Sequence, residues 1–184
     1  MDCTNLPAWP LPLVGVRIRV RALRPNDMDA FRSYRSDPEV ARYQGWSPMG
    51  EQEACAFIDA MADVEGPRLG TWVQLGIACV DDDRLIGDIG LYVSPDGSSA
   101  QIGYSCAVPY QRQGLTTEAL RLVISEMFAR TQCQSIRAVV DPRNIPSKRL
   151  LARLGFVVID AFAGQSEVSR LADDTYELPR PGRL

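Results

Sequence analysis

The sequence predicts a single-domain mixed α/β protein with a central, mostly antiparallel sheet. Two observations predict this fold class: strand and helix patterns alternate along the chain, and three strand patterns follow one another with only short turns between them. A length of 184 residues suits one domain. With 46% hydrophobic and 23% charged residues, the composition is that of an ordinary folded protein. We expect one domain over residues 1–184, in which residues 1–14 form an extended N-terminal arm.

The first half of the chain alternates between helix and strand patterns. Residues 16–23 alternate apolar and basic side chains, which predicts a strand with one buried face. A helix follows, capped by Asn26 or Asp27, and it ends before Pro38 because the residue before a proline disfavours the helical conformation. Apolar residues at helical spacing predict a second helix over residues 47–61. The next strands are separated by turns that contain Asp, Gly and Ser, which predicts an antiparallel meander. These strands cover residues 71–80, 85–93 and 98–108.

The second half begins with a long, strongly amphipathic helix that starts at Gly114. The pattern then predicts a strand, a helix, another strand and a final strand at the edge of the sheet before Pro179. These elements cover residues 135–140, 145–154, 156–163 and 167–178. In total, we expect about seven strands flanked by about four helices.

The composition excludes several classes of chemistry. The chain has no histidine, so it has neither a Ser-His-Asp or Cys-His nucleophile nor an HExxH zinc site. A net charge of -3 argues against nucleic acid as a partner. The apolar stretches are shorter than the roughly 18 residues of a membrane span. We therefore expect no metal, no nucleic-acid partner and no membrane partner.

The cysteines are odd in number and widely spaced, and they form no Cys-x-x-Cys pair. This usage predicts reduced, small core residues rather than a zinc or redox site. The residues are Cys3, Cys55, Cys79, Cys106 and Cys133. The N-terminal segment lacks the basic-then-apolar pattern of a signal peptide, and we expect a cytoplasmic protein.

The most informative segment joins the last strand of the meander to the long helix. The exposed N–H groups at a helix start, together with the helix dipole, favour an anion such as a diphosphate. Gly114 allows close approach of the backbone, and Arg112 adds positive charge. Thr116 and Thr117 offer hydroxyl donors. The other interpretation is an ordinary strand-to-helix connection in which Glu118 caps the helix.

This segment resembles the acyl-CoA pyrophosphate loop of the GNAT N-acetyltransferases, whose pattern is Gln/Arg-x-x-Gly-x-Gly/Ala. Gln111, Gly114 and Thr116 stand at the motif positions, and Thr116 departs from the Gly or Ala of the family. Ile-Gly-Tyr at residues 102–104 precedes the loop, and Thr-Glu-Ala at residues 117–119 follows it. Both are similar to the Rim-like branch, the type that acetylates the N-terminal alanine of ribosomal proteins.

Further segments resemble the same family. Residues 139–147, with the helix that ends in Leu-Gly-Phe at residues 154–156, are similar to its Asn-x-x-Ser segment. Residues 18–27 are similar to its Leu-Arg-x-Leu-x-x-x-Asp opening. The resemblance therefore spans about residues 17–178, which is nearly the whole chain.

The resemblance implies a GNAT-like fold with acetyl-CoA as co-substrate, in which the fourth and fifth strands splay apart to admit pantetheine. Asn144 would hydrogen-bond CoA and Ser147 would lie near the acetyl sulfur, although from the residues alone Asn144 caps a helix that Gly155 ends. Backbone N–H groups would hold pantetheine, and one near Ala107 would polarise the thioester oxygen. The implied CoA-binding residues are Cys106, Ala107, Val108, Gln111, Arg112, Gln113, Gly114, Leu115, Thr116, Thr117, Asn144 and Ser147.

Acetyl transfer to an amine needs an acceptor for the amine proton and a proton donor for the leaving thiolate. The resemblance makes Ser147 the first candidate for the acid and Tyr104 the second, although either can be an ordinary helix or core residue. Asp88, in the middle of a predicted strand, is a candidate base or amine ligand, or else a solvent-facing residue. Gln101 and Val139 stand where many family members carry Glu, so the base stays unassigned.

Tyr43 and Trp46, in the loop between the first two helices, are candidate acceptor-binding residues, and the alternative for Trp46 is a cover for the core. The leading hypothesis is an acetyl-CoA-dependent N-acetyltransferase whose acceptor, the primary amine of a protein N-terminus or of a small molecule, attacks the thioester directly. The alternative hypothesis is an acyl-CoA-binding sensor with little or no turnover, which the missing Glu residues and Thr116 suggest. A monomer and a homodimer fit equally.

Overall fold

The computed structural model describes residues 6–47, 49–161 and 173–182, and it contains one 8-stranded sheet with the strand order β1-β2-β3-β4-β5-β6-β8-β7. The strands are β1 (Leu13–Val14), β2 (Ile18–Ala22), β3 (Val73–Cys79), β4 (Leu85–Val93), β5 (Ser99–Cys106), β6 (Ser135–Val140), β7 (Val157–Ala161) and β8 (Asp174–Pro179). The α-helices are α1 (Met28–Arg35), α2 (Pro38–Ala41), α3 (Glu51–Ala62), α4 (Leu115–Arg130) and α5 (Ile145–Arg153). Two short 3-10 helices are η1 (Pro25–Asp27) and η2 (Val108–Tyr110). The mixed α/β fold class is confirmed.

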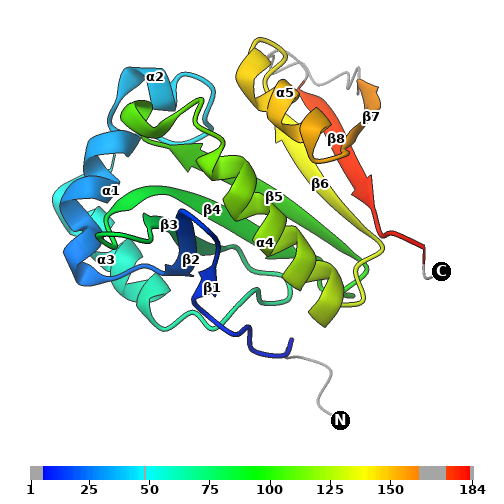
Figure 1. Ribbon diagram of the computed structural model, residues 1–184, viewed down its shortest axis with the longest axis horizontal. Helices are drawn as coiled ribbons and strands as arrows, with labels where there is room; N and C mark the ends of the chain where they lie inside the picture. The colour runs from blue at the N-terminus through cyan, green and yellow to red at the C-terminus, as the bar shows by residue number, and fades with distance from the viewer. Residues whose placement is uncertain (1–5, 48, 162–172, 183–184) are drawn as a thin grey trace.

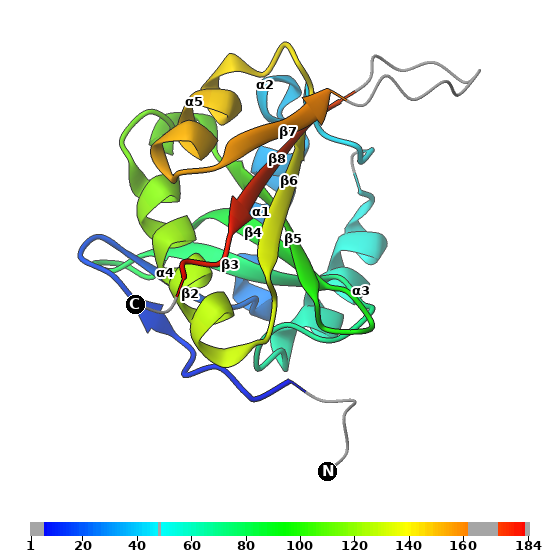
Figure 2. The same ribbon diagram turned by 90° about the vertical axis from the view of Figure 1, so that its right-hand side faces the viewer.

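Helices cover both faces of the sheet. Figure 1 shows α4 crossing the sheet, and Figure 2 shows α3 on the opposite side of the strands from α4. Leu120 and Val123 of α4 belong to one buried cluster with Ile89 of β4 and Ile136 of β6. A second cluster, which includes Phe31, lies under α1 and α3. The amphipathic patterns of the sequence therefore describe helices that each bury one face against a common sheet.

The pairing of β5 with β6 is unlike that of the other strands. These two strands run parallel, whereas the other neighbouring pairs are antiparallel. Their pairing covers only residues 99–101 of β5 and 135–137 of β6, and beyond it the strands diverge (Figure 1). The predicted fourth and fifth strands correspond to β5 and β6, because β1 adds a strand before them. The expected splay is therefore present, and it leaves the backbone of residues 102–106 without a strand partner on that side.

The expectation that the last strand lies at the edge of the sheet is wrong. β8 is not at the edge of the sheet, because it lies between β6 and β7 and is antiparallel to both. Tyr176 of β8 is only 5% exposed, and burial of this side chain favours an inner position, whereas Val157 of the edge strand β7 is 56% exposed. Pro179 is the last residue of β8, where a missing N–H costs little. Predicted strand residues within 162–172 lie outside the described residues.

Two short elements of the first half are not predicted by the sequence. Leu13–Val14, at the end of the expected arm, pairs with β2, and Trp9 before it is buried in the core. Pro38 ends α1 as expected, but it also begins α2, because its fixed φ suits a first helical turn. The Asp37 side chain caps α2 by accepting a hydrogen bond from Glu39 N at 2.8 Å.

Two residues of the opening motif form a buried ion pair. Nη1 of Arg21 lies 2.7 Å from Oδ2 of Asp27, and Nη2 lies 2.9 Å from Oδ1. Asp27 also accepts a hydrogen bond from Arg24 N at 2.8 Å. The pair fixes the corner between β2 and α1, so these motif residues are structural.

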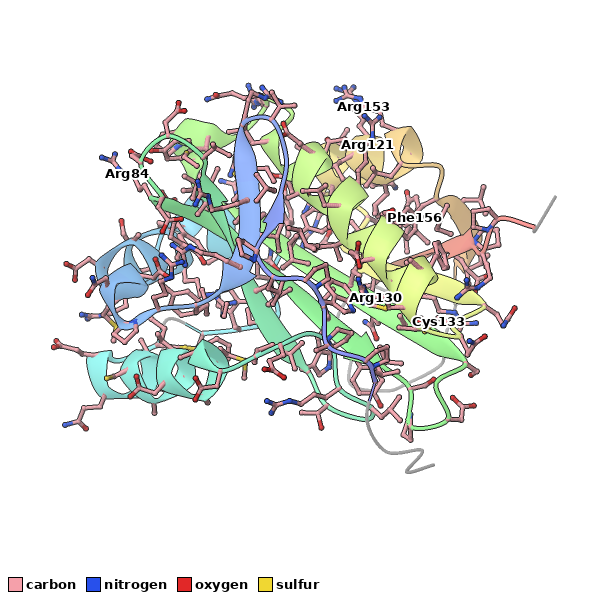
Figure 3. All side chains as sticks on the ribbon, turned by 60° about the horizontal axis from the view of Figure 1, so that its bottom comes forward. Arg84, Arg121, Arg130, Cys133, Arg153 and Phe156 are labelled. Atoms are coloured by element: carbon pink, nitrogen blue, oxygen red, sulfur yellow. The ribbon has the colours of Figure 1, made fainter. Side chains whose placement is uncertain are left out.

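The cysteines differ in burial. Cys133 is buried in the segment just after α4 (Figure 3), as expected of a core residue. Cys55 is exposed, so the expectation is wrong for this residue, and Cys79 and Cys106 are intermediate. These four are free thiols, and Cys3 lies outside the described residues. Within the described part of the chain, no group of three or more Cys, Asp or Glu residues could hold a metal ion. No helix in that part has the length and apolar character to span a membrane.

The packing of α4 on the sheet can be tested with Leu120→Ala. Leu120 is 0% exposed, so its removal leaves a cavity and should lower the free energy of unfolding by about 3 kcal/mol. The neighbouring Arg121 projects from the exposed side of α4 (Figure 3). Arg121→Ala should therefore change the free energy of unfolding by less than about 0.5 kcal/mol. Urea unfolding followed by circular dichroism measures both. Equal losses in the two variants would contradict this packing.

Candidate active site

A pocket of about 70 Å³ lies where β5 and β6 diverge. Its walls come from both strands, from the start of α5 and from the loop after α2. The lining residues are Tyr43, Gln44, Ile102, Gly103, Tyr104, Ala138, Val139, Val140, Asp141, Asn144 and Ser147. Segments that lie about a hundred residues apart in the sequence therefore meet at one point, and they include several of the residues singled out above.

Tyr104 and Ser147, the two candidate acids, touch each other across this pocket. The Tyr104 hydroxyl lies 2.7 Å from Oγ of Ser147, and either oxygen can be the donor. Burial raises the pKa of Tyr104 to about 12, and the hydrogen bond from Ser147 acts in the opposite direction. Tyr104 therefore keeps its proton at neutral pH, and the linked hydroxyls can pass a proton along a short path.

The start of α5 positions Ser147. Asn144 is the N-cap residue, and its side chain accepts a hydrogen bond from Ser147 N at 3.2 Å. Pro146 in the first turn is compatible with a helix start. The capping interpretation of Asn144 is therefore confirmed, while its contact with CoA stays a prediction. Both roles are compatible, because Asn144 also lines the pocket.

The loop before α4 has the backbone geometry that an anion site requires. Gly114 has φ 78° and Arg112 has φ 61°, so both lie in the left-handed region. No side chain caps the helix at Gly114, and the loop is exposed, so the N–H groups at the helix start are accessible to a diphosphate. The capping interpretation of Glu118 is wrong, because its carboxylate accepts hydrogen bonds from Val16 N and Arg17 N of the β1–β2 turn.

The side chains of two glutamines in the loop donate hydrogen bonds to nearby backbone carbonyl groups. Nε2 of Gln111 donates to the carbonyl oxygen of Cys106 at 2.9 Å, and Nε2 of Gln113 donates to that of Pro109 at 2.8 Å. Their side-chain amides therefore brace the turn. The predicted CoA contacts of these two residues stay a prediction, open to their backbone groups and to their side-chain oxygens.

The backbone amides next to the loop differ in whether they are available to a ligand. Ala107 N donates to the carbonyl oxygen of Ile86 at 2.8 Å, just beyond the pairing of β4 with β5. The Ala107 amide itself is therefore engaged, and the expected contact of a nearby amide with the thioester oxygen stays a prediction. Because amides alternate in direction along an antiparallel strand, the amide of Cys106 points to the opposite side, where β5 separates from β6.

Asp88 lies in a buried ion pair, and neither a solvent-facing position nor a free base fits this environment. It is 0% exposed, and its Oδ2 lies 2.9 Å from Nη2 of Arg35. Oδ2 also accepts from the Tyr34 hydroxyl, and Oδ1 accepts from Nε2 of Gln74 at 2.9 Å. Burial, followed by the charge of Asp88, raises the pKa of Tyr34 well above its usual value. A carboxylate that is held by this many donors does not suit proton abstraction. In the sequence, the only sign of a special role for Asp88 is an acidic residue within an apolar strand.

The two predicted acceptor residues occupy different places. Tyr43 lines the pocket, beside Gln44, whose Nε2 donates to the carbonyl oxygen of Tyr104 at 3.3 Å. Trp46 stacks on the Arg35 guanidinium, whose central carbon lies 4.3 Å from the ring centroid. Trp46 therefore covers the buried Asp88 ion pair and does not line this pocket.

Comparison with known proteins agrees with this geometry. A family model described as "Acetyltransferase (GNAT) domain" matches residues 17–157. The uncharacterized N-acetyltransferase YoaA of Bacillus subtilis is 31% identical over 142 residues, which is 76% of this chain and 79% of that protein. The chain belongs to the GNAT acetyltransferase family. It is therefore an acyltransferase, and the family uses acetyl-CoA as donor.

Solved structures share the GNAT fold. A putative ribosomal-protein-serine acetyltransferase from Vibrio cholerae superposes with a TM-score of 0.74 at 23% identity, over 92% of this chain and 98% of that chain. RimL, a ribosomal alpha-N-protein acetyltransferase in complex with coenzyme A, superposes with a TM-score of 0.74 at 15% identity, over 90% of this chain and 96% of that chain. At these identities the likeness supports the fold.

The acidic groups near the GNAT pocket are few. Gln101 pairs with Arg137 at the closed end of the β5–β6 junction, and Val139 lines the pocket. Of the lining residues, Asp141 alone carries a carboxylate. Hydrogen bonds from the Arg143 side chain and backbone lower the pKa of Asp141 to about 2. Asp141 is therefore a very weak base.

The structural role of Asp88 can be tested by removing it. Because Asp88→Ala leaves the Arg35 charge buried and unpaired, the free energy of unfolding should fall by about 3–5 kcal/mol. The double variant Asp88→Leu with Arg35→Met removes both charges and should recover most of that loss. Urea unfolding measures both variants, and a loss below about 1 kcal/mol in Asp88→Ala would argue against the ion pair.

Proposed function

We propose that this GNAT enzyme transfers the acetyl group of acetyl-CoA to a primary amine by direct attack in a ternary complex. The observation that carries the proposal is the contact between Tyr104 and Ser147 across the pocket where β5 and β6 diverge. The contact supplies proton-donating groups at the point where the family resemblance puts the acetyl sulfur.

Acetyl-CoA would extend from the loop before α4 into this pocket. The N–H groups at the start of α4 would bind the diphosphate, with Arg112 beside them and the Thr116 and Thr117 hydroxyls in the first turn. Pantetheine would lie along the unpaired side of β5, where the amide of Cys106 has the direction of a strand partner. Val108 and Leu115 would flank this path.

The reaction balances without an external acid. The neutral amine nitrogen attacks the thioester carbonyl carbon, a C–N bond forms, and the C–S bond breaks. The nitrogen loses one proton and the sulfur gains one, so the Tyr104–Ser147 pair would carry a proton to the leaving sulfur while it regains one from the reacting nitrogen or from water. A backbone N–H of β5 would stabilise the negative charge on the carbonyl oxygen.

The acceptor ammonium must lose a proton before attack, and we propose that water removes it. Asp141 is too weak a base because of its ion pair with Arg143. Asp88 is held by Arg35. Deprotonation by solvent predicts an activity that rises with pH as the acceptor amine itself titrates.

The acceptor class has two candidates. A protein N-terminus is supported by the two structural neighbours described as ribosomal-protein acetyltransferases. A small-molecule amine suits the small pocket, of which Tyr43 and Gln44 form one wall. A panel of N-terminal peptides and small amines distinguishes them.

Calorimetric titration of acetyl-CoA tests the donor. The wild-type protein should bind acetyl-CoA with a Kd in the micromolar range, and Gly114→Trp should weaken binding at least about tenfold, since a side chain is strained in the left-handed region and would block the phosphate site. Gly97→Trp, which carries a similar strain in the β4–β5 turn, serves as the control and should bind normally. No binding in the wild type would refute the proposal, and binding without turnover of any amine would favour the sensor.

Kinetics of Tyr104→Phe and Ser147→Ala test the acid pair. Each variant should lower kcat by about 100-fold with little change in the KM for acetyl-CoA, because the lost group acts in the transition state. Tyr92→Phe, at a tyrosine that packs against Trp72 outside the pocket, should leave kcat unchanged. In Ser147→Ala the pKa of Tyr104 should rise, because the hydrogen bond with Ser147 lowers it. Unaltered kcat in both variants would exclude this acid.

A further inference from the structure

The turn between β1 and β2 lies against the start of α4, about a hundred residues away in the sequence (Figure 3). Glu118, in the first turn of α4, accepts hydrogen bonds at Oε1 from Val16 N at 2.7 Å and from Arg17 N at 2.8 Å. Its Oε2 lies 3.1 Å from Nε of Arg17. One carboxylate therefore binds two backbone amides and one guanidinium of the same turn.

Gly15 provides the space for this carboxylate. A Cβ atom on Gly15 would lie 2.5 Å from Oε1 of Glu118 and 3.2 Å from the carbonyl oxygen of Ile18. Any other residue would push the carboxylate away or displace the turn. The close fit indicates that the β1–β2 turn and α4 dock in one specific arrangement.

Arg17 also contacts the loop that would bind the diphosphate. Its Nη1 donates to the carbonyl oxygen of Gln113 at 2.9 Å. Its Nη2 lies 3.5 Å from the position of a Cβ on Gly114, so the guanidinium lies against the left-handed glycine of the loop. About half of the Arg17 side chain is exposed, which leaves its outer edge open to a ligand.

The charges explain why an arginine is useful at this position. Burial acts to raise the pKa of Glu118, but hydrogen bonds from Arg17 and Val16 outweigh it and hold the pKa below its usual value. Glu118 is therefore ionised close to the site where the diphosphate would bind. Without Arg17, its negative charge would repel the phosphates.

We propose that Arg17 is a positioning residue of the CoA site, which holds the Gly114 loop in its binding geometry and directs positive charge at the CoA phosphates. Glu118 anchors the Nε and the backbone N–H of Arg17, and the β1–β2 turn places Arg17 at the site. The inference rests on the proposed function, because it concerns the same acetyl-CoA site. It assigns a part of that site to a turn outside the known loop motif.

The test compares two acetyl donors in steady-state kinetics. Arg17→Ala should raise the KM for acetyl-CoA about tenfold with little change in kcat, because it removes charge-assisted contacts at the phosphates. With S-acetylpantetheine, a thioester without phosphates, Arg17→Ala and the wild type should have equal KM values. Arg17→Lys keeps the charge but loses the planar fork, and it should give an intermediate KM for acetyl-CoA.

Arg130→Ala is the matched control. Arg130 pairs with Glu126 on the same helix, but it lies at the other end of α4 (Figure 3), about 20 Å away, and its removal should leave both KM values unchanged. Equal KM values for acetyl-CoA in Arg17→Ala and the wild type would overturn the inference, and so would an equal rise for both donors. Failure of the wild type to bind acetyl-CoA would instead refute the proposed function.

Discussion

The early end of the pairing between β5 and β6 is the constraint on which the site depends. Beyond Gln101 the two strands separate, so backbone groups in the middle of a sheet must find other partners. Side chains satisfy some of them: Gln44 binds the carbonyl oxygen of Tyr104, and Gln111 binds that of Cys106. The amide of Cys106 faces the opening, where a ligand with its own amide groups can complete the strand pattern. The same interruption thus creates the pocket and the hydrogen-bonding edge for pantetheine.

Polar interactions fix the elements around the opening on both faces of the sheet. Asn144 caps α5 and thereby fixes Ser147 opposite Tyr104. On the other side of the sheet, Asp88 and Arg35 form a buried pair under Trp46. Buried pairs of this kind contribute little net stability, but they fix the orientation of the helices that carry them. The site is therefore held in place before a substrate arrives, which lowers the entropy cost of binding.

Sequence reasoning works here where periodicity or a local turn decides the outcome. The bounds of β4 and β6 follow directly from their apolar runs, and the Asn144 cap follows from a local preference. The partners of Asp88 could not be predicted, because Tyr34 and Arg35 reach it from a helix more than fifty residues away. The inner position of β8 likewise depends on which strand edge is available after the rest of the sheet has formed. Whether the amide of Ala107 faces β4 depends on the register between β4 and β5. The alternation of apolar residues does not fix that register to the exact residue.

The high pKa of Tyr104 bears on how the proposed acid acts. A thiol has an ordinary pKa of about 8.5, so complete transfer of a proton from a tyrosine with a pKa of about 12 to a thiolate is unfavourable by about 5 kcal/mol. A relay avoids this cost, because the tetrahedral intermediate carries a more acidic proton on the former amine nitrogen. The Tyr104 hydroxyl can accept that proton while the Ser147 hydroxyl donates to sulfur, so neither oxygen becomes a free anion. A weakly acidic pair suits this role, since it stays neutral at each stage and needs no carboxylate in the pocket.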